Sequence, residues 1–305
     1  MIDRLIKGIK EKENPTVVGL DPTYAMMPEY LVKEMIEKHG KTPKAVAQMF
    51  LEFNKQIIDS TYDLIPAVKP QIAMYENYGL AGIETYIKTV EYAKSKGLVV
   101  IGDIKRGDIA STAAAYSSHI GITDIEGEKY DIWGADSVTL NPYMGYDAIE
   151  PFIDNCNNLD KGMFVLVKTS NPHGGQIQDL IVGKDNEKVY EKVAKLVADW
   201  GEEAMGELGY SKIGAVVGAT YPEEAAQIRK LMPNTYFLVP GYGAQGADAE
   251  KLQGCFNKDG LGAIVNSSRG IIASYKSSTE FSEKEFAKAS RAAVIAMKED
   301  LQRIL

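Results

Sequence analysis

A short charged segment in the first half of the chain carries the residue types that move protons and stabilise negative charge. Residues 103–108 read Asp-Ile-Lys-Arg-Gly-Asp. Side chains two residues apart on a strand point the same way, so we expect Asp103 and Lys105 to share a face and Asp108 to lie in the following loop or helix start. With carboxylates on both sides, Lys105 is a candidate ammonium acid and electrostatic stabiliser rather than a nucleophile.

Two further charged residues, Asp21 and Lys69, also come directly after short apolar runs. A single charge at a strand end is often only solvated by water. Here three carboxylates and two ammonium groups are expected at one end of one structure. Charges on buried strands are costly unless they are paired, so an Asp-x-Lys pair there favours an active site over a solvated edge.

Two glycine-containing segments near the end of the chain have the features of a phosphate site. Residues 240–246 read Pro-Gly-Tyr-Gly-Ala-Gln-Gly, and residues 266–270 read Asn-Ser-Ser-Arg-Gly. Glycine permits close backbone approach, and the guanidinium of Arg269 can bind phosphate through two parallel hydrogen bonds. One glycine-rich turn is usually only a turn, but two of them after the last two predicted strands indicate phosphate binding.

Lys168 is a third candidate lysine, at the head of the polar segment Lys-Thr-Ser-Asn-Pro. It could form a Schiff base, as in barrel aldolases, if desolvation made it a free amine. The sequence offers no specific activating partner, so a structural role for Lys168, with the polar loop contacting the ligand, is the favoured interpretation.

The elements that must position these residues are short, β-branched apolar runs. They are too short for helices and lack polar alternation, as expected for parallel strands buried on both faces. The runs are Thr16–Leu20, Ile65–Val68, Leu98–Ile101, Ser137–Leu140, Phe164–Val167, Gly214–Val217, Tyr236–Val239 and Gly262–Val265. Helical patterns such as Lys44–Tyr62 and Tyr221–Leu231 separate them.

This alternation predicts an α/β fold, a (β/α)8 TIM barrel spanning residues 1–305 as one domain with loop insertions. A doubly wound open sheet is the alternative, since eight units do not prove closure, and uneven spacing argues against a solenoid. The amphipathic segment Met1–Lys12 is expected to form a helix that caps the barrel, and Glu283–Leu305 a final helix.

Composition excludes several classes of protein. The 305 residues are 45% hydrophobic and 25% charged, as in soluble globular proteins, and the net charge of −8 argues against nucleic acid or an anionic membrane as partner. No run approaches the length of a membrane span, and the mixed charges of the first residues do not fit a signal peptide. Two distant cysteines and three histidines predict a cytoplasmic location without disulfides or a metal site.

Four motifs give the sequence a specific resemblance over most of its length. It resembles the orotidine 5′-phosphate decarboxylases, in their longer-chain bacterial branch. The motifs are Gly-Leu-Asp-Pro at 19–22, Ala-Val-Lys-Pro at 67–70, Asp-Ile-Lys-Arg-Gly-Asp-Ile-Ala-Ser-Thr at 103–112 and the glycine-rich residues 240–246. The Asp-x-Lys-x-x-Asp core is shared by a wider group of barrels, so the other motifs are needed for the resemblance.

The resemblance implies a role for each residue of this core. Lys105 would donate a proton to C6 of the pyrimidine after carbon dioxide leaves, and Asp103 would lie beside the substrate carboxylate. Asp108, Ile109 and Thr112 would reach into the neighbouring subunit's site, so the active enzyme would be a homodimer.

The resemblance also implies where the nucleotide is held. The ribose hydroxyls would contact Asp21 and Lys69, and the pyrimidine edge would contact Ser170 with Thr169 beside it. The phosphate site would comprise Gln245 and Arg269, with Pro240 and Gly270 also binding substrate. Ser268 precedes Arg269 where shorter relatives have glycine. Members of the family need neither a metal nor an organic cofactor.

Two other functions remain open from the residues alone. One is a sugar-phosphate lyase on the same barrel, acting through magnesium and an enediolate or through a Schiff base on Lys168. The other is a barrel that binds a nucleotide without catalysis.

Overall fold

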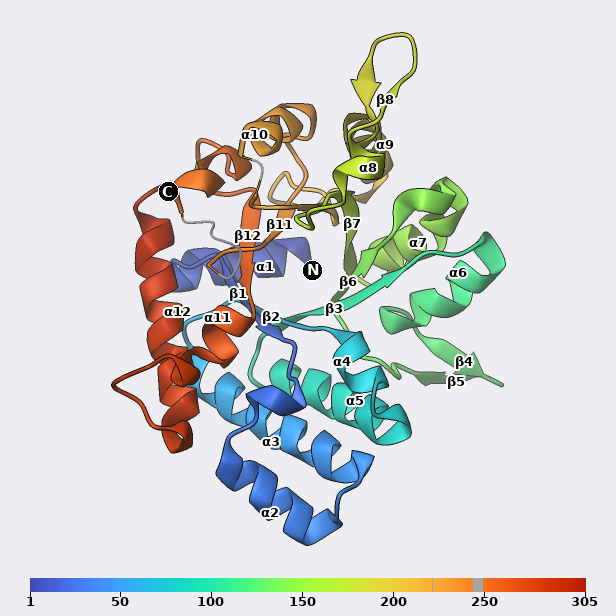
Figure 1. Ribbon diagram of the computed structural model, residues 1–305. Coiled ribbons are helices and arrows are strands. Elements are labelled where there is room, and N and C mark those ends of the chain that lie inside the picture. The colour runs from blue at the N-terminus through green and yellow to red at the C-terminus, as the bar shows by residue number, and fades with distance from the viewer. Residues whose placement is uncertain (221, 244–248) are drawn as a thin grey trace.

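Eight parallel strands close into a barrel in the order β1, β12, β11, β10, β7, β6, β3, β2 (Figure 1). The computed structural model describes residues 1–220, 222–243 and 249–305. The strands are β1 Thr16–Leu20, β2 Ala67–Pro70, β3 Val99–Arg106, β6 Ser137–Leu140, β7 Gly162–Lys168, β10 Ile213–Val217, β11 Phe237–Pro240 and β12 Ala263–Ser267. Each predicted run contributes one strand. The predicted (β/α)8 barrel is therefore confirmed, and the open sheet is excluded.

Alternate residues of each strand pack on opposite sides of the barrel wall. Val18 and Val100 belong to the core between the strands and the surrounding helices, whereas Val17 and Ile101 belong to a second core in the barrel interior. Both faces are buried, which explains why the strands lack polar alternation.

Helix α1 (Ile2–Lys12) closes one end of the barrel and crosses behind the strands in Figure 1. Its apolar residues Ile2, Leu5, Ile6 and Ile9 are buried and pack with the interior core of the barrel. Their three- and four-residue spacing places them on one helical face, so the predicted capping helix is confirmed.

The remaining helices surround the strands. They are α2 Glu29–His39, α3 Pro43–Thr61, α4 Ile72–Glu76, α5 Gly79–Ser95, α6 Ala110–Tyr116, α7 Glu150–Asn158, α8 Gly175–Gln178, α9 Val189–Gly201, α10 Pro222–Leu231, α11 Arg269–Ile272 and α12 Phe286–Gln302. The expected final helix is split, because a short 3-10 turn, Glu283–Glu285, with a capping box at Ser282 precedes α12. No helix within the described ranges is long and apolar enough to cross a membrane.

Two small hairpins are inserted between barrel units. One pairs β4 (Thr123–Ile125) with β5 (Glu128–Tyr130), and the other pairs β8 (Ile181–Val182) with β9 (Glu187–Lys188). The second hairpin projects from the barrel beside α8 in Figure 1. Such insertions lie in loops, where additional length costs little stability.

Strand β3 differs most from its predicted extent. The apolar run ends at Ile101, yet the strand continues to Arg106 and so includes the charged segment itself. Its pairing with β6 shifts register between Gly102 and Arg106, as at a β-bulge. Asp103 and Lys105 therefore lie on the strand itself, and Asp108 follows it, as predicted.

Candidate active site

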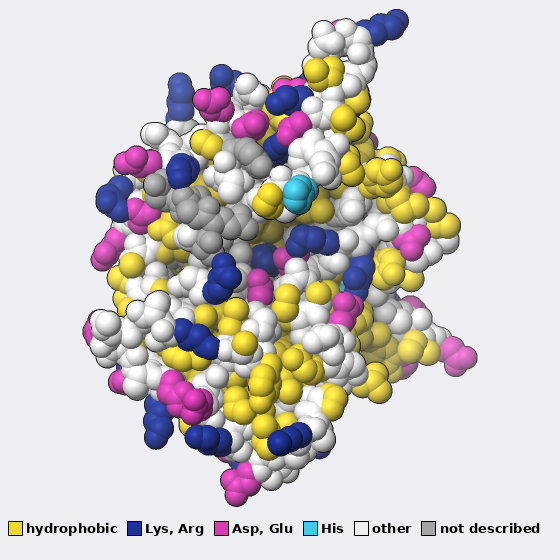
Figure 2. All heavy atoms as spheres, viewed as in Figure 1, with side chains coloured by type: hydrophobic (Ala, Val, Ile, Leu, Met, Phe, Trp, Pro, Cys, Tyr) yellow, Lys and Arg dark blue, Asp and Glu magenta, His cyan; other side chains and the backbone are white. Residues whose placement is uncertain are grey.

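A cavity of about 350 Å³ lies at the carboxyl ends of the barrel strands. It is lined by Lys69, Asp103, Lys105, Thr139, Leu166, Thr169, Ser170, Asn171, Val216, Leu238 and Pro240. Figure 2 views this face and shows acidic and basic side chains meeting in the hollow at its centre. A cleft of about 490 Å³ beside α1, at the other end of the barrel, contains none of the predicted site residues.

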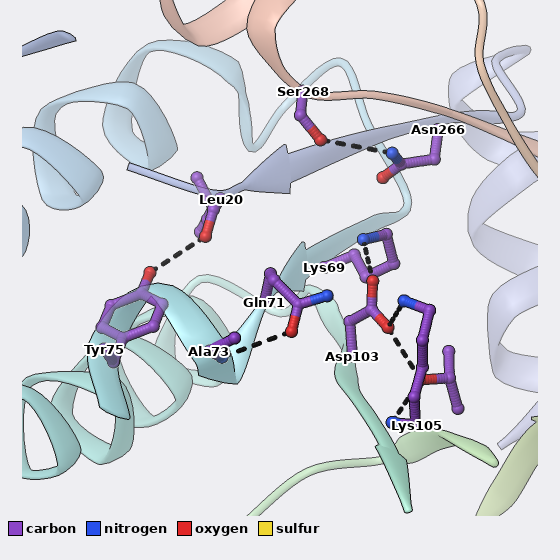
Figure 3. Close-up of polar contacts among 10 residues, drawn as sticks. Leu20, Lys69, Gln71, Ala73, Tyr75, Asp103, Lys105, Asn266 and Ser268 are labelled. Atoms are coloured by element: carbon purple, nitrogen blue, oxygen red, sulfur yellow. Dashed lines mark hydrogen bonds and ion pairs between the residues drawn. The ribbon is translucent and has the colours of Figure 1, made fainter. Parts of the chain in front are cut away.

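Asp103 joins the two lysines at the floor of the cavity. Lys69 Nζ lies 2.6 Å from Asp103 Oδ2, and Lys105 Nζ lies 2.5 Å from Asp103 Oδ1 (Figure 3). Ile104, between Asp103 and Lys105, packs into the core on the helix side of the strand. The prediction that Asp103 and Lys105 share one face is therefore confirmed, and Lys69 joins them from the neighbouring strand β2.

The electrostatics of this cluster favour charged groups. Burial opposes ionisation of Asp103, but the ammonium groups of Lys69 and Lys105 outweigh it and hold the pKa of this carboxyl well below its usual range. Burial likewise opposes the charge on Lys69, yet Asp103 and Asp21 outweigh it and raise the lysine's pKa. The site thus holds a carboxylate and ammonium groups in fixed positions.

Thr139 on β6 completes the cluster, although no motif in the sequence indicated it. Its hydroxyl donates to Asp103 Oδ1 at 2.8 Å and accepts from the backbone N–H of Lys105 at 3.0 Å. One available signal is that β6 reads Ser-Val-Thr-Leu, so Thr139 is a polar residue near the end of a fully buried strand. The alternation of side chains along a strand, however, does not show which neighbouring carboxylate Thr139 contacts.

Asp21 follows β1 at the edge of the same cluster. It is half-buried, and its Oδ1 is buried without a hydrogen-bond partner among the described residues. The preceding residue is fixed, because the carbonyl of Leu20 accepts a hydrogen bond from the Tyr75 hydroxyl at 3.1 Å (Figure 3). Gly19 is required here, since a Cβ at this position would lie 1.9 Å from Ser268 Oγ.

The opposite wall of the cavity combines an apolar surface with a polar loop. Leu166, Val216 and Leu238 supply the apolar surface. Thr169 is fixed by α8, because its N–H donates to Gln178 Oε1 at 3.0 Å and its hydroxyl accepts from Gln178 Nε2 at 2.7 Å. Ser170 packs against Gly218, where a Cβ would lie 2.8 Å from the Ser170 nitrogen.

Lys168 is not among the residues that line this cavity. It is buried as the last residue of β7, and its Nζ lies 2.5 Å from Asp179 Oδ1 and 4.8 Å from the ring centre of Tyr190. An ammonium held by a carboxylate and an aromatic face is a structural cation. The structural interpretation of Lys168 therefore fits better than a Schiff-base role.

The predicted phosphate residues are only partly gathered around the cavity. Pro240 lines it, whereas Arg269 is the exposed first residue of α11 and is followed by the exposed Gly270. Gln245 lies outside the described residues. Asn266 on β12 is buried, and its Nδ2 donates to Ser268 Oγ at 3.3 Å (Figure 3).

Asp108, Ile109 and Thr112 lie outside the cavity of their own chain. Asp108 accepts a hydrogen bond from the N–H of Ile109 at 2.8 Å just before α6, and Thr112 is half-buried on α6. Ile109 is 53% exposed, although isoleucine is among the residues most often buried in proteins.

Metal-ligating residues are not clustered in the part of the chain that the structure describes, where no three His, Cys, Asp or Glu side chains gather as they would around an ion. Both cysteines are buried free thiols, and burial raises the pKa of Cys156 and of Cys255 to about 12. Neither is a reactive nucleophile.

A closed barrel of parallel strands, with paired charges around a cavity at their carboxyl ends, defines a (β/α)8-barrel enzyme. The chain belongs to the orotidine 5′-phosphate decarboxylase / HUMPS family, whose sequence model matches residues 15–283. The resemblance predicted from the four motifs is therefore confirmed.

Individual relatives agree with this assignment over nearly the whole chain. The chain is 41% identical to the orotidine 5′-phosphate decarboxylase of Caldicellulosiruptor bescii, covering 98% of this chain and 97% of the relative. It is 43% identical to that of Petrotoga mobilis, covering 99% and 98%. The solved structure of Leishmania donovani OMP decarboxylase is 30% identical, with a TM-score of 0.74, covering 99% of this chain and 97% of that one.

Proposed function

We propose that this chain converts orotidine 5′-phosphate to uridine 5′-phosphate without a metal or organic cofactor. The bond between C6 and the carboxylate breaks, carbon dioxide leaves, and the electron pair stays on C6. The Lys105 ammonium stabilises this carbanion and transfers a proton from Nζ to C6. The lysine then regains a proton from solvent.

The observation that carries the proposal is the array of Lys69, Asp103 and Lys105 around the cavity. The C6 carbanion cannot delocalise as an enolate, so fixed charges must provide much of the stabilisation. An ammonium about 4 Å from a full negative charge contributes roughly 4 kcal/mol at an effective dielectric of about 20. This corresponds to roughly three orders of magnitude in rate, so further contributions are needed.

The apolar wall and the remote phosphate supply two of these contributions. Leu166, Val216 and Leu238 exclude water from one side of the cavity, which strengthens every interaction between charges inside it. Arg269, together with Gln245, Pro240 and Gly270, would bind the phosphate. Binding energy from this remote group orders the site and so raises kcat as well as lowering KM.

The remaining substrate contacts follow from the positions of the polar groups. Lys69 on β2 and Asp21, which follows the adjacent strand β1, would bind the ribose hydroxyls. Thr169 and Ser170, on the opposite wall, would bind the pyrimidine edge. The substrate carboxylate would lie beside Asp103, whose repulsion favours loss of carbon dioxide.

A second copy of the chain would complete the site. Ile109 is 53% exposed and Tyr143 is 84% exposed, and their two loops meet where Gly107 packs against Asn141. Figure 2 shows hydrophobic side chains over the nearby region of α6 and α7. Contiguous exposed apolar surface is typical of an interface. Burial of this surface in a homodimer would carry Asp108, Ile109 and Thr112 into the partner's cavity.

The decisive experiment measures uridine 5′-phosphate directly, by chromatography and mass spectrometry, after chelator-treated protein has been incubated with orotidine 5′-phosphate. We expect product from the wild type, none from Lys105→Ala, and normal turnover from the control Lys33→Ala, whose side chain is 78% exposed on α2. Uridine 5′-phosphate should still bind to Lys105→Ala.

Other outcomes would favour the alternatives. Tight binding of uridine 5′-phosphate with no product from the wild type would indicate a nucleotide-binding barrel. Activity that returns only with magnesium would contradict the metal-free proposal. Full turnover by Lys105→Ala would remove Lys105 from the mechanism.

A further inference from the structure

The hydroxyl of Thr139 connects the two groups on which the proposed chemistry depends. It donates to Asp103 Oδ1 at 2.8 Å and accepts the backbone N–H of Lys105 at 3.0 Å. A hydroxyl has one proton and can also accept a hydrogen bond. Because the oxygen accepts the hydrogen bond from the Lys105 N–H, the proton can be donated to Asp103. Thr139 is 1% exposed. Solvent therefore cannot readily substitute for these two bonds.

The backbone at Lys105 needs this support. Its φ is +46°, in the left-handed region that a side chain with a Cβ rarely adopts. The residue lies where the pairing of β3 with β6 shifts register, between Gly102 and Arg106. An N–H at such a bulge lacks its usual partner in the sheet, and here the Thr139 hydroxyl accepts it. The unusual backbone turns the Lys105 side chain toward Asp103 (Figure 3).

Thr139 itself is firmly held. It pairs with Phe164 of β7 in the regular parallel register on the other side of β6. Three donors consequently fix the Asp103 carboxylate, with Lys69 on Oδ2 and both Lys105 and Thr139 on Oδ1. The hydroxyl is the only one of these donors that also restrains the Lys105 backbone.

We propose that Thr139 is a positioning residue for decarboxylation. It holds the Asp103 carboxylate and the left-handed backbone of Lys105 in the geometry that the reaction requires. The inference rests on the proposed roles of Lys105 and Asp103. Thr139 acts through these residues, so its loss should impair the chemical step more than ground-state binding. A misplacement of about 1 Å in an active site can reduce the rate by roughly 100-fold.

The chain offers a matched control on the same strand. Ser137 lies two residues before Thr139 on β6, is fully buried, and has a hydroxyl with no hydrogen-bond partner among the described residues. Ser137→Ala therefore removes a buried hydroxyl from the same face of the same strand without breaking a contact to the site.

The test compares Thr139→Val, Thr139→Ser and Ser137→Ala in the full-length protein. For Thr139→Val we expect kcat to fall by about 10- to 100-fold while KM changes by less than about threefold. Thr139→Ser, which keeps the hydroxyl, should restore most of kcat, and Ser137→Ala should match the wild type. If Thr139→Val does not fold, Thr139→Ala is measured in its place.

Ligand affinities separate positioning from a merely structural role. Uridine 5′-phosphate has no charge at C6, whereas an analogue with an anionic oxygen at C6 mimics the carbanion. Thr139→Val should lose affinity for the charged analogue in proportion to its loss of kcat and bind uridine 5′-phosphate normally. Equal loss of affinity for both ligands would indicate general disruption and overturn the inference.

A Thr139→Val variant with wild-type kcat would also overturn the inference. The Lys105→Ala variant keeps this failure distinct from failure of the proposed mechanism. If Lys105→Ala is inactive while Thr139→Val is normal, only the role of Thr139 is wrong. If Lys105→Ala is active, the mechanism itself is wrong.

Discussion

Lys69 Nζ lies 2.6 Å from Asp103 Oδ2, and the two residues are only 4% and 5% exposed. They come from adjacent strands of the barrel, so their separation is fixed by the sheet rather than by flexible loops. A buried ion pair of this kind adds little net stability, because both charges lose their hydration. Its consequence is that neither charge can be removed alone without leaving the other poorly compensated.

Removal of either partner should therefore destabilise the fold, and removal of both should cost less than the sum. We expect Lys69→Met to reduce the free energy of unfolding by about 3 kcal/mol, because Asp103 loses a buried partner. The loss is not larger because Asp103 still has Lys105 and Thr139 as partners. Urea unfolding of Lys69→Met, Asp103→Asn and the double variant measures the coupling. Simple additivity would show that the pair is not coupled.

The low pKa of Asp103 gives the same pair a pH signature. A carboxyl whose pKa is lower in the folded state than in the unfolded state stabilises the fold at pH values above the unfolded-state pKa. This contribution is lost as the pH falls from the unfolded-state pKa toward the folded-state pKa. The stability difference between the wild type and Asp103→Asn should thus shrink as pH falls below about 4. A difference that stays constant from neutral pH into this range would contradict the assigned ionisation.

Mixing two inactive variants tests whether the site is shared between subunits. If Lys105 of one chain works with Asp108 of its partner, a hybrid of Lys105→Ala and Asp108→Asn contains one intact site. Random assortment of the chains should restore about a quarter of wild-type activity, since half of the dimers are hybrids with one good site each. Activity is measured after co-expression and purification.

Two results would argue against a shared site. Mixtures without activity, despite hybrids detected by native mass spectrometry, would place Lys105 and Asp108 in the same chain's site. A wild-type protein that sediments as a monomer while active would exclude the shared site altogether.

The Arg269 guanidinium should matter only when the substrate carries a phosphate. Arg269→Ala is expected to lower kcat/KM for orotidine 5′-phosphate by about 10- to 100-fold, the loss of one charge-assisted contact. The same variant should act normally on orotidine, which lacks the phosphate and provides an internal control. An equal loss with both substrates would mean that Arg269 supports the fold of the loop instead.

Much of the barrel was predictable because strand formation here depends on local sequence. The run Thr16–Leu20 matches β1 residue for residue, and every residue in it is buried. Two-residue periodicity predicted that Asp103 and Lys105 share a face, but it did not predict the left-handed backbone of Lys105 at the register shift. Because the predicted strands are parallel, the charged residues at the ends of β1, β2 and β3 could also be placed at one end of the barrel.

Contacts between distant residues were beyond the reach of such patterns. The Thr139 bond to Asp103 and the Asp179 partner of Lys168 depend on the register of neighbouring strands and the path of a loop. The left-handed backbone of Lys105 is equally hidden, because side-chain type usually predicts that conformation only for glycine, asparagine or aspartate. These features require the three-dimensional arrangement.

His119, buried just after α6, is expected to make the fold sensitive to acid. It ends the short 3-10 helix Ser117–His119, and its ring stacks on Trp133 with centres 4.1 Å apart. Its Nδ1 is buried without a partner among the described residues. Burial, assisted by the nearby Arg106 charge, lowers the pKa of His119 to about 4.

The lowered pKa means that the unfolded chain binds a proton at His119 more readily than the folded chain. The free energy of unfolding should therefore have its full value above about pH 6.5 and fall by about 3 kcal/mol as the pH drops toward about 4. His119→Phe keeps the stacked ring but removes the titrating nitrogen, so its free energy of unfolding should depend less on pH across this range. His173→Ala, at an exposed position, should follow the wild-type curve. If His119→Phe loses stability as steeply as the wild type in urea titrations between these pH values, another group causes the acid sensitivity.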